Sequence, residues 1–415
     1  MAQRYSEVIS RTLRRAERRV PTNQEETPLV IEPHTSPSVG FLREFLGHYS
    51  STLLEDLARF GAILLRGFDV ETCDDFERHI LSIRGMRGMK EILFSEPGRT
   101  IVGGTRFVFH TNSLVKTGGT LRFGTFHTEN YFFPDVPRYV SFWCQTPSRF
   151  GGETGLVNVA ELYRDLPTGL KRRLEEKACL VRVYPFSEVG KRYGVSLEAI
   201  DRFCRDANLP VATINDSKYV CIYKPSVIQH PGTGERALVI NFTALPSLQK
   251  PLVTAFLPDY RGSQWLLHRL VWKAPCLAQA GKPKVIAYRF SQWMRRSFKK
   301  QCRVRAPSEF GSGIVLQEQF SADDVQMLAK AIRSRYCSFL WKRGDVLIID
   351  NLKIAHNGMA GRGDRTLKVM MCNPIPLPSS GESRGLHILS QSDDCRLCLG
   401  AQMARLGDRI AGAGE

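Results

Sequence analysis

The sequence predicts a mixed α/β protein that is mainly β, with a double-stranded β-helix (jelly-roll) core, helical insertions and flanking helices. Short apolar segments bounded by turn residues recur along the chain, as in GAILLRGF (61–68), YVSFWCQTP (139–147) and GDVLIIDN (344–351). This is the pattern of buried strands. Segments with helical periodicity are inserted early and centrally, an arrangement that suits a jelly roll carrying insertions.

The helical segments follow in order along the chain. Apolar residues recur three and four positions apart in 39–60, which predicts helix directly before the first strand. A further helix is expected in 321–336, with Ser321 as its N-cap. Other segments predict central helices, the last of them buried: 160–178, 196–209 and QWLLHRLVWK (264–273).

At 415 residues the chain is long enough for one large domain with insertions or for two domains. We expect one domain over 31–375, with a lid-like insertion at about 160–340. A basic mobile arm (1–30) precedes it and a tail (376–415) follows. Arginines near the N-terminus leave an organelle-targeting sequence open, but the glutamates there favour a solvated helix or a floppy tail.

Composition is that of an ordinary globular protein, with 43% hydrophobic and 24% charged residues. No run approaches the roughly eighteen apolar residues that span a bilayer, and no secretory h-region is present. Eleven cysteines without a disulfide-like framework suit a reducing compartment, so we expect a cytoplasmic protein. Cys395 and Cys398 form a single CxxC, for which coincidence is favoured over a zinc site or a redox pair.

The net charge of +17 raises the hypothesis of nucleic-acid binding. Against it, Lys and Arg are dispersed, and no zinc-finger, RNP-like or helix-turn-helix signature is present. One short cluster, MRRSFKKQCRVR (294–305), is a candidate docking patch for an acidic protein, or a solvated face. The sequence does not indicate an oligomeric state.

Three residues form a candidate metal site: His127 and Glu129 in GTFHTENYFFPDVPRY (124–139), and His356 in the downstream segment RGDVLIIDNLKIAHNGMAGRGDR. Two imidazoles and one carboxylate on one face of a metal are the usual ligands of non-haem Fe(II) in O₂ chemistry. In an H-x-E pair both side chains point to the same face of an extended segment. The pair alone is a weak signal, but apolar strands adjoin both segments, so we expect the ligands at strand ends.

Two more residues fit a site of this type, which needs a co-substrate held by its carboxylate. Thr154 lies in the turn FGGETG (150–155), and Arg365 follows His356 by nine residues. A guanidinium is the best bidentate partner of a carboxylate. Taken alone, each would be interpreted as an ordinary turn or loop residue.

These motifs resemble the TauD/TfdA family of Fe(II)/2-oxoglutarate-dependent dioxygenases, and within it the SyrP-like branch, which uses H-x-E. The resemblance covers roughly residues 30–375. The segments that carry it are 61–70, 126–167, 191–209, 230–246 and 344–371.

The resemblance implies that His127, Glu129 and His356 ligate Fe(II), and that Thr154 and Arg365 hold the C5 carboxylate of 2-oxoglutarate. Arg362 and Lys368 are nearby cations. It further implies O₂-dependent oxidation of an unactivated C–H bond, with release of succinate and CO₂. The substrate would be an amino acid or a derived metabolite, either free or tethered to an acidic carrier protein.

Glu129 stands where related halogenases carry a small residue, which favours hydroxylation over halogenation. Desaturation or cyclisation at the same iron remains open. A non-catalytic partner-binding or regulatory protein, or a nucleic-acid binder, is an alternative, although the presence of all three ligands counts against the former. Arg122, Asn130 and Asn241 are candidate substrate contacts, and His110 is either a pocket residue or a structural histidine.

Overall fold

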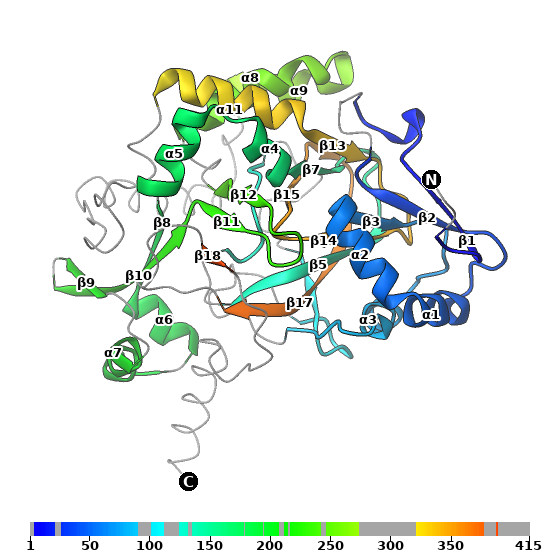
Figure 1. Cartoon of the computed structure of the whole chain (residues 1–415), viewed down its shortest axis with the longest axis horizontal. Helices are drawn as coiled ribbons and strands as arrows, with labels where there is room; N and C mark the ends of the chain where they lie inside the picture. The colour runs from blue at the N-terminus through cyan, green and yellow to red at the C-terminus, as the bar shows by residue number, and fades with distance from the viewer. Residues whose placement is uncertain are drawn as a thin grey trace, which may run out of the picture.

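The computed structural model describes residues 4–20, 26–89, 101–111, 124–131, 135–177, 179–193, 195–206, 211–214, 216–241, 246–273, 321–376 and 387–388. Strands occupy the centre of the molecule and helices lie around them (Figure 1). The α-helices are α1 (Val39–His48), α2 (Ser50–Phe60), α3 (Cys73–Ser82), α4 (Val159–Asp165), α5 (Thr168–Lys177), α6 (Phe186–Tyr193), α7 (Leu197–Asp206), α8 (Pro246–Phe256), α9 (Leu266–Lys273) and α11 (Ala322–Ser334). Single 3₁₀ turns are η1 (Arg15–Glu17), η3 (Leu257–Asp259) and η4 (Ser263–Trp265).

The largest sheet has seven strands in the order β1-β2-β3-β14-β5-β17-β4. Its members are β1 (Val8–Arg11), β2 (Leu29–Pro33), β3 (Ala62–Leu65), β14 (Val346–Asp350), β5 (Asp135–Thr146), β17 (Thr366–Pro376) and β4 (Val108–His110). A second sheet has the order β13-β7-β15, from β13 (Tyr336–Phe339), β7 (Thr154–Asn158) and β15 (Ile354–Gly358).

Three small sheets complete the described strands. Their orders are β16-β6, β8-β10-β9 and β12-β11-β18. Their members are β6 (Phe150–Gly151), β8 (Cys179–Pro185), β9 (Val211–Ile214), β10 (Ser217–Pro225), β11 (Val227–Gln229), β12 (Arg236–Leu238), β16 (Gly361–Arg362) and β18 (His387–Ile388).

Strand β14 is buried on both faces, which explains its unbroken apolar sequence VLIID. Leu347 and Ile349 point into a core that also contains Leu156 and Phe339 of the second sheet, so the two sheets face each other across it. The intervening residues, Val346 and Ile348, pack on the other face against the core formed with α1, α2 and α3. The predicted mainly β architecture with flanking helices is confirmed.

Local signals account for the helix boundaries. The predicted helix in 321–336 is confirmed as α11, which begins at Ser321 with a capping box completed by Asp324. The segment 160–178 instead divides into α4 and α5, because Pro167 disfavours helical backbone at the preceding Leu166, which is extended.

Helix α9 lies in the region predicted to be a buried helix, but only one of its faces is buried. Trp272 and His268 point inward, whereas Leu266, Leu267 and Leu270 are 57%, 41% and 48% exposed. The prediction of a buried helix is therefore correct for one face only.

Residues 4–20 are ordered against the domain and do not form the mobile arm that their polar composition indicated. Strand β1 pairs antiparallel with β2, and Tyr5 is buried against Phe45. The carboxylate of Glu17 accepts a hydrogen bond from the buried Arg66 at 2.9 Å. Buried apolar residues and several ion pairs, among them Arg4 with Asp56 and Arg11 with Glu32, attach this segment to the domain.

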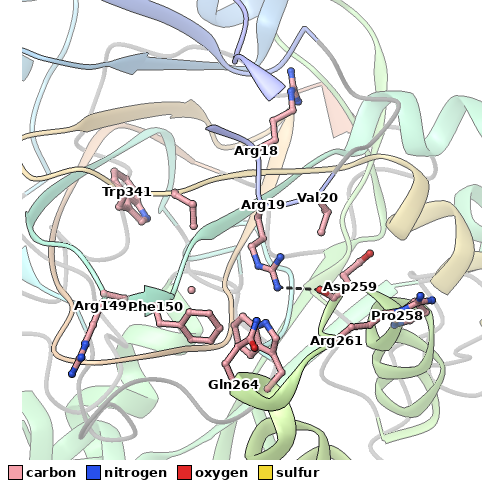
Figure 2. Close-up of a pocket in the computed structure, with 14 residues that line it drawn as sticks. Arg18, Arg19, Val20, Arg149, Phe150, Pro258, Asp259, Arg261, Gln264 and Trp341 are labelled. Atoms are coloured by element: carbon pink, nitrogen blue, oxygen red, sulfur yellow. Dashed lines mark hydrogen bonds between the residues drawn. The ribbon is translucent and has the colours of Figure 1, made fainter. Parts of the chain in front are cut away.

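Arg19 extends this attachment to the turn beside β7. Its guanidinium stacks over Tyr260 and Trp265 and donates to the carbonyl oxygen of Asp259 at 3.0 Å (Figure 2). Its Nε lies 3.8 Å from the carboxylate of Glu153, which is fully buried. Burial raises the pKa of Glu153 to about 7, although Arg19 and Arg365 oppose the shift.

No helix in the described part of the chain is both long and apolar enough to cross a lipid bilayer.

The raised pKa of Glu153 predicts a pH-dependent stability that Glu153→Gln should remove. The folded state favours the protonated carboxyl, so the stability that this group contributes is present below pH 4.5 and lost as the pH rises through about 7. Urea unfolding at pH 5 and pH 8 should show the wild type losing on the order of 3 kcal/mol more than the variant. Equal losses in the two proteins would contradict the assignment.

Candidate metal centre

A backbone bridge joins the two segments that carry the predicted ligands. His127 N donates to His356 O at 3.1 Å, and His356 N donates to His127 O at 3.0 Å. Residues paired in this way present their side chains on the same face. The two imidazole rings accordingly lie side by side, with centroids 4.5 Å apart.

Glu129 completes the cluster. Its Oε2 lies 3.5 Å from His127 Nε2 and 3.4 Å from His356 Nε2, and one ligand atom from each residue lies within 4.8 Å of the others. Metal bonds of roughly 2.0–2.2 Å to such ligands place neighbouring donor atoms about 3 Å apart. The donor set and its spacing therefore fit a divalent metal of the Fe(II) type.

The surroundings orient both rings. His127 Nδ1 lies 2.9 Å from Thr125 O, and because a carbonyl oxygen only accepts, the ring proton is on Nδ1 and the Nε2 lone pair faces Glu129. His356 packs edge-on against Phe142, at 5.1 Å between centroids. The His127 side chain is 36% exposed and the other two ligands 6% each, so the cluster opens to solvent on the His127 side.

The strand position of His356 differs from the expectation. It lies in the middle of β15, and β14, the strand predicted to end at the ligand, precedes it by one turn. That turn is anchored by Asp350, whose Oδ2 accepts from Arg138 Nη2 and His230 Nε2, each at 2.8 Å. Burial alone would raise the pKa of Asp350, but Arg138 and His230 outweigh it and hold the pKa below its usual range.

Thr154 and Arg365 converge on Gly358, two residues beyond His356. Thr154 is the cross-strand partner of Gly358, and a Cβ on Gly358 would stand 3.2 Å from Arg365 Nη2. Residues two apart on a strand share a face and lie about 6.6–6.8 Å apart. The space left by the missing side chain of Gly358 thus separates the candidate metal ligands from a hydroxyl and a guanidinium, a layout that suits a short dicarboxylate.

Arg365 is half-buried and donates to Gly152 O at 2.5 Å. Burial lowers the pKa of its guanidinium, and within the described residues no carboxylate lies in ion-pair distance of it. The other nearby cations are less suitable. Arg362 is exposed. Leu367 points into the core between the two sheets, so the next residue, Lys368, points to the other face of β17, where it donates to His110.

Trp341 was not singled out from the sequence. Its indole Nε1–H donates to Thr154 Oγ1 at 3.1 Å. Because this bond occupies an acceptor position of the hydroxyl, the Thr154 proton is directed to another acceptor. Nothing in the local sequence around Trp341 indicates this contact, which depends on the pairing of β13 with β7.

Two of the three candidate substrate contacts adjoin the ligand cluster, and their amides bind protein groups there. Arg122 lies outside the described residues. Asn130 has left-handed backbone (φ 53°), which asparagine tolerates, and its amide contacts Met371 Sδ at 3.2 Å. Asn241 bonds to the backbone of Thr128. Their contact with substrate stays a prediction, as does that of His110.

A hollow of about 700 Å³ borders β6 (Figure 2). Phe150, Gly151 and Trp341 line it, together with Arg19 and Arg149, whereas the three metal ligands do not. The hollow is therefore distinct from the candidate metal centre.

Comparison with known proteins gives the family. Residues 42–371 match the model of the family described as "Taurine catabolism dioxygenase TauD, TfdA family". A curated clavaminate synthase-like protein of Arabidopsis thaliana is 23% identical over 334 residues, which cover 78% of this chain and 84% of that protein.

Solved structures similar to this chain include a putative alpha-ketoglutarate-dependent taurine dioxygenase from Burkholderia xenovorans, at 13% identity and a TM-score of 0.45, over 90% of this chain and 96% of that one. PvcB from Pseudomonas aeruginosa matches at 12% identity and a TM-score of 0.45, over 90% and 94%. The assignment rests on the family model, which spans most of the chain. The chain belongs to the TauD/TfdA family of Fe(II)/2-oxoglutarate-dependent dioxygenases.

Proposed function

We propose that His127, Glu129 and His356 hold the iron of this dioxygenase, and that the enzyme oxidises an unactivated C–H bond of an amino acid or an amino-acid-derived metabolite. The observation that carries the site assignment is the convergence of the three donor atoms within 4.8 Å. Bound Fe(II) and 2-oxoglutarate supply O₂ activation coupled to oxidative decarboxylation of the co-substrate to succinate and CO₂.

The protein side chains bind the metal, leave access for substrate and orient the co-substrate. Glu129 and the two imidazoles occupy one face and leave the exposed His127 side for substrate. Arg365 and the Thr154 hydroxyl bind the distal carboxylate of 2-oxoglutarate. This carboxylate serves as the counter-ion of Arg365, which has no carboxylate in ion-pair distance among the described residues. Trp341 keeps the Thr154 proton directed at that carboxylate.

The substrate class follows from the resemblance to the SyrP-like branch, whose H-x-E motif this chain carries at His127 and Glu129. A carboxylate ligand at 129 favours hydroxylation, with desaturation or cyclisation as alternatives at the same iron. A carrier-tethered substrate would bring an acidic protein partner. The basic segment 294–305 proposed to meet it lies outside the described residues.

His127→Ala should abolish stoichiometric iron binding while the fold is retained, because it removes one of three ligands from an exposed edge of the cluster. Protein loaded anaerobically with Fe(II) and then desalted should retain close to one iron per chain in the wild type and in the exposed-site control His34→Ala. Circular dichroism checks the fold. Full iron content in folded His127→Ala would rule out this site.

Arg365→Lys keeps a positive charge but loses the planar pair of donors, so 2-oxoglutarate should bind roughly 10- to 100-fold more weakly. Fe(II) binding without co-substrate should not change. Arg362→Lys, at the exposed neighbouring cation, is the matched control and should leave both affinities unaltered. If the two variants behave alike, Arg365 is not the carboxylate partner.

Trp341→Phe removes only the indole donor to Thr154, and we expect 2-oxoglutarate affinity to fall by roughly 2- to 10-fold, the value of one neutral hydrogen bond. The double variant with Thr154→Val should be no weaker than Thr154→Val alone, because both changes act on one hydroxyl. Isothermal titration with Fe(II)-loaded protein measures this coupling, and additive losses would contradict it.

A further inference from the structure

In the segment His127–Thr128–Glu129, the backbone N–H and C=O of every residue make hydrogen bonds to other parts of the chain. His127 pairs with the backbone of His356. Of the three residues, only His127 pairs with a strand in the described structure, through its bridge to His356 of β15. The backbone groups of Thr128 and Glu129 are bound instead by two asparagine side chains.

Asn241 binds the middle residue of the segment. Its Oδ1 accepts from Thr128 N at 2.9 Å, and its Nδ2 donates to Thr128 O at 3.0 Å. Asn351 does the same for the ligand residue itself, because its Oδ1 accepts from Glu129 N at 2.7 Å and its Nδ2 donates to Glu129 O at 3.0 Å.

This arrangement follows the geometry of an extended chain, in which successive residues direct their N–H and C=O groups to opposite sides. His127 and Glu129 thus face the segment containing Asn351 and His356, whereas Thr128 faces Asn241. A primary amide carries one acceptor and two N–H donors on one planar group, so it matches the paired N–H and C=O of a single strand residue.

Asn351 is itself rigidly placed. It is fully buried, its N–H donates to Arg138 O at 2.9 Å, and its Nδ2 also donates to Pro137 O at 2.8 Å. It directly follows Asp350, whose carboxylate is bound by Arg138 and His230. The clamp on Glu129 is therefore attached to the central sheet and does not depend on a bound metal.

We propose that Asn241 and Asn351 are positioning residues that preform the ligand segment 127–129 before metal binds and thereby set the metal affinity. This rests on the proposed function in so far as the metal is Fe(II). The preformed backbone itself is a property of the metal-free chain and is tested separately.

The test compares Asn241→Asp and Asn351→Asp, each of which keeps the amide's acceptor oxygen and replaces its donor. Asn373→Asp is the matched control: Asn373 accepts from Arg87 N and donates to Gly85 O, each at 2.7 Å, so its amide makes the same kind of backbone clamp at another segment. Hydrogen–deuterium exchange of the metal-free proteins is followed in peptides covering 124–131, and Fe(II) and Mn(II) affinities are measured by titration.

In the metal-free wild type and the control, we expect slow exchange of the Thr128 and Glu129 amides. Both clamp variants should exchange faster in 124–131 alone and bind metal about 10- to 100-fold more weakly, the usual effect of losing an outer-shell partner. Fast exchange in the metal-free wild type overturns the proposal without reference to any variant. The proposal is also overturned if both Asn241→Asp and Asn351→Asp fold, bind metal as tightly as the wild type and exchange their amides at the wild-type rate. If the wild type shows protected amides but binds no Fe(II), the proposed function fails and the preformed backbone stands.

Discussion

The pair of hydrogen bonds between the backbones of His127 and His356 is the contact on which the site depends. It joins two segments that lie far apart in the chain and fixes both imidazoles on one face. Glu129 reaches that face only because an extended segment returns to the same side after two residues. A shift of the 127–129 segment by one residue in this pairing would turn His127 and Glu129 away from His356.

The core provides the rigidity that this contact needs. Strand β14 is buried on both faces between two apolar cores. The turn after it contains Asn351 and leads directly into β15, which carries His356. Two polar side chains of this turn have firm partners: Asp350 binds Arg138 and His230, and Asn351 binds the Glu129 backbone. Buried charges kept in such pairs are costly to break singly, so the turn has one well-defined arrangement.

Residue patterns predicted the parts of the fold that local chemistry decides. The apolar run of β14 and the Ser321 cap of α11 were predicted from their own segments, and the three candidate ligands do lie close together. Contacts between distant segments could not be predicted in this way. Trp341 meets Thr154 only through strand pairing, and the sequence around Asn241 does not indicate that its amide binds the Thr128 backbone. Residues 4–20 appeared polar enough for an arm, yet their attachment through β2 and Arg66 depends on residues elsewhere in the chain.

The same limit applies to the residues proposed to bind 2-oxoglutarate. Sequence spacing suggested Thr154 and Arg365, but only the fold brings both to the vacant side of Gly358, one strand period from His356. Anaerobic titration of the metal-free protein with Fe(II) and 2-oxoglutarate tests this account most directly. The account predicts a visible metal-to-ligand charge-transfer band that saturates at one Fe(II) per chain and requires 2-oxoglutarate. Folded protein that binds Fe(II) without producing the band, or binds none, would contradict it.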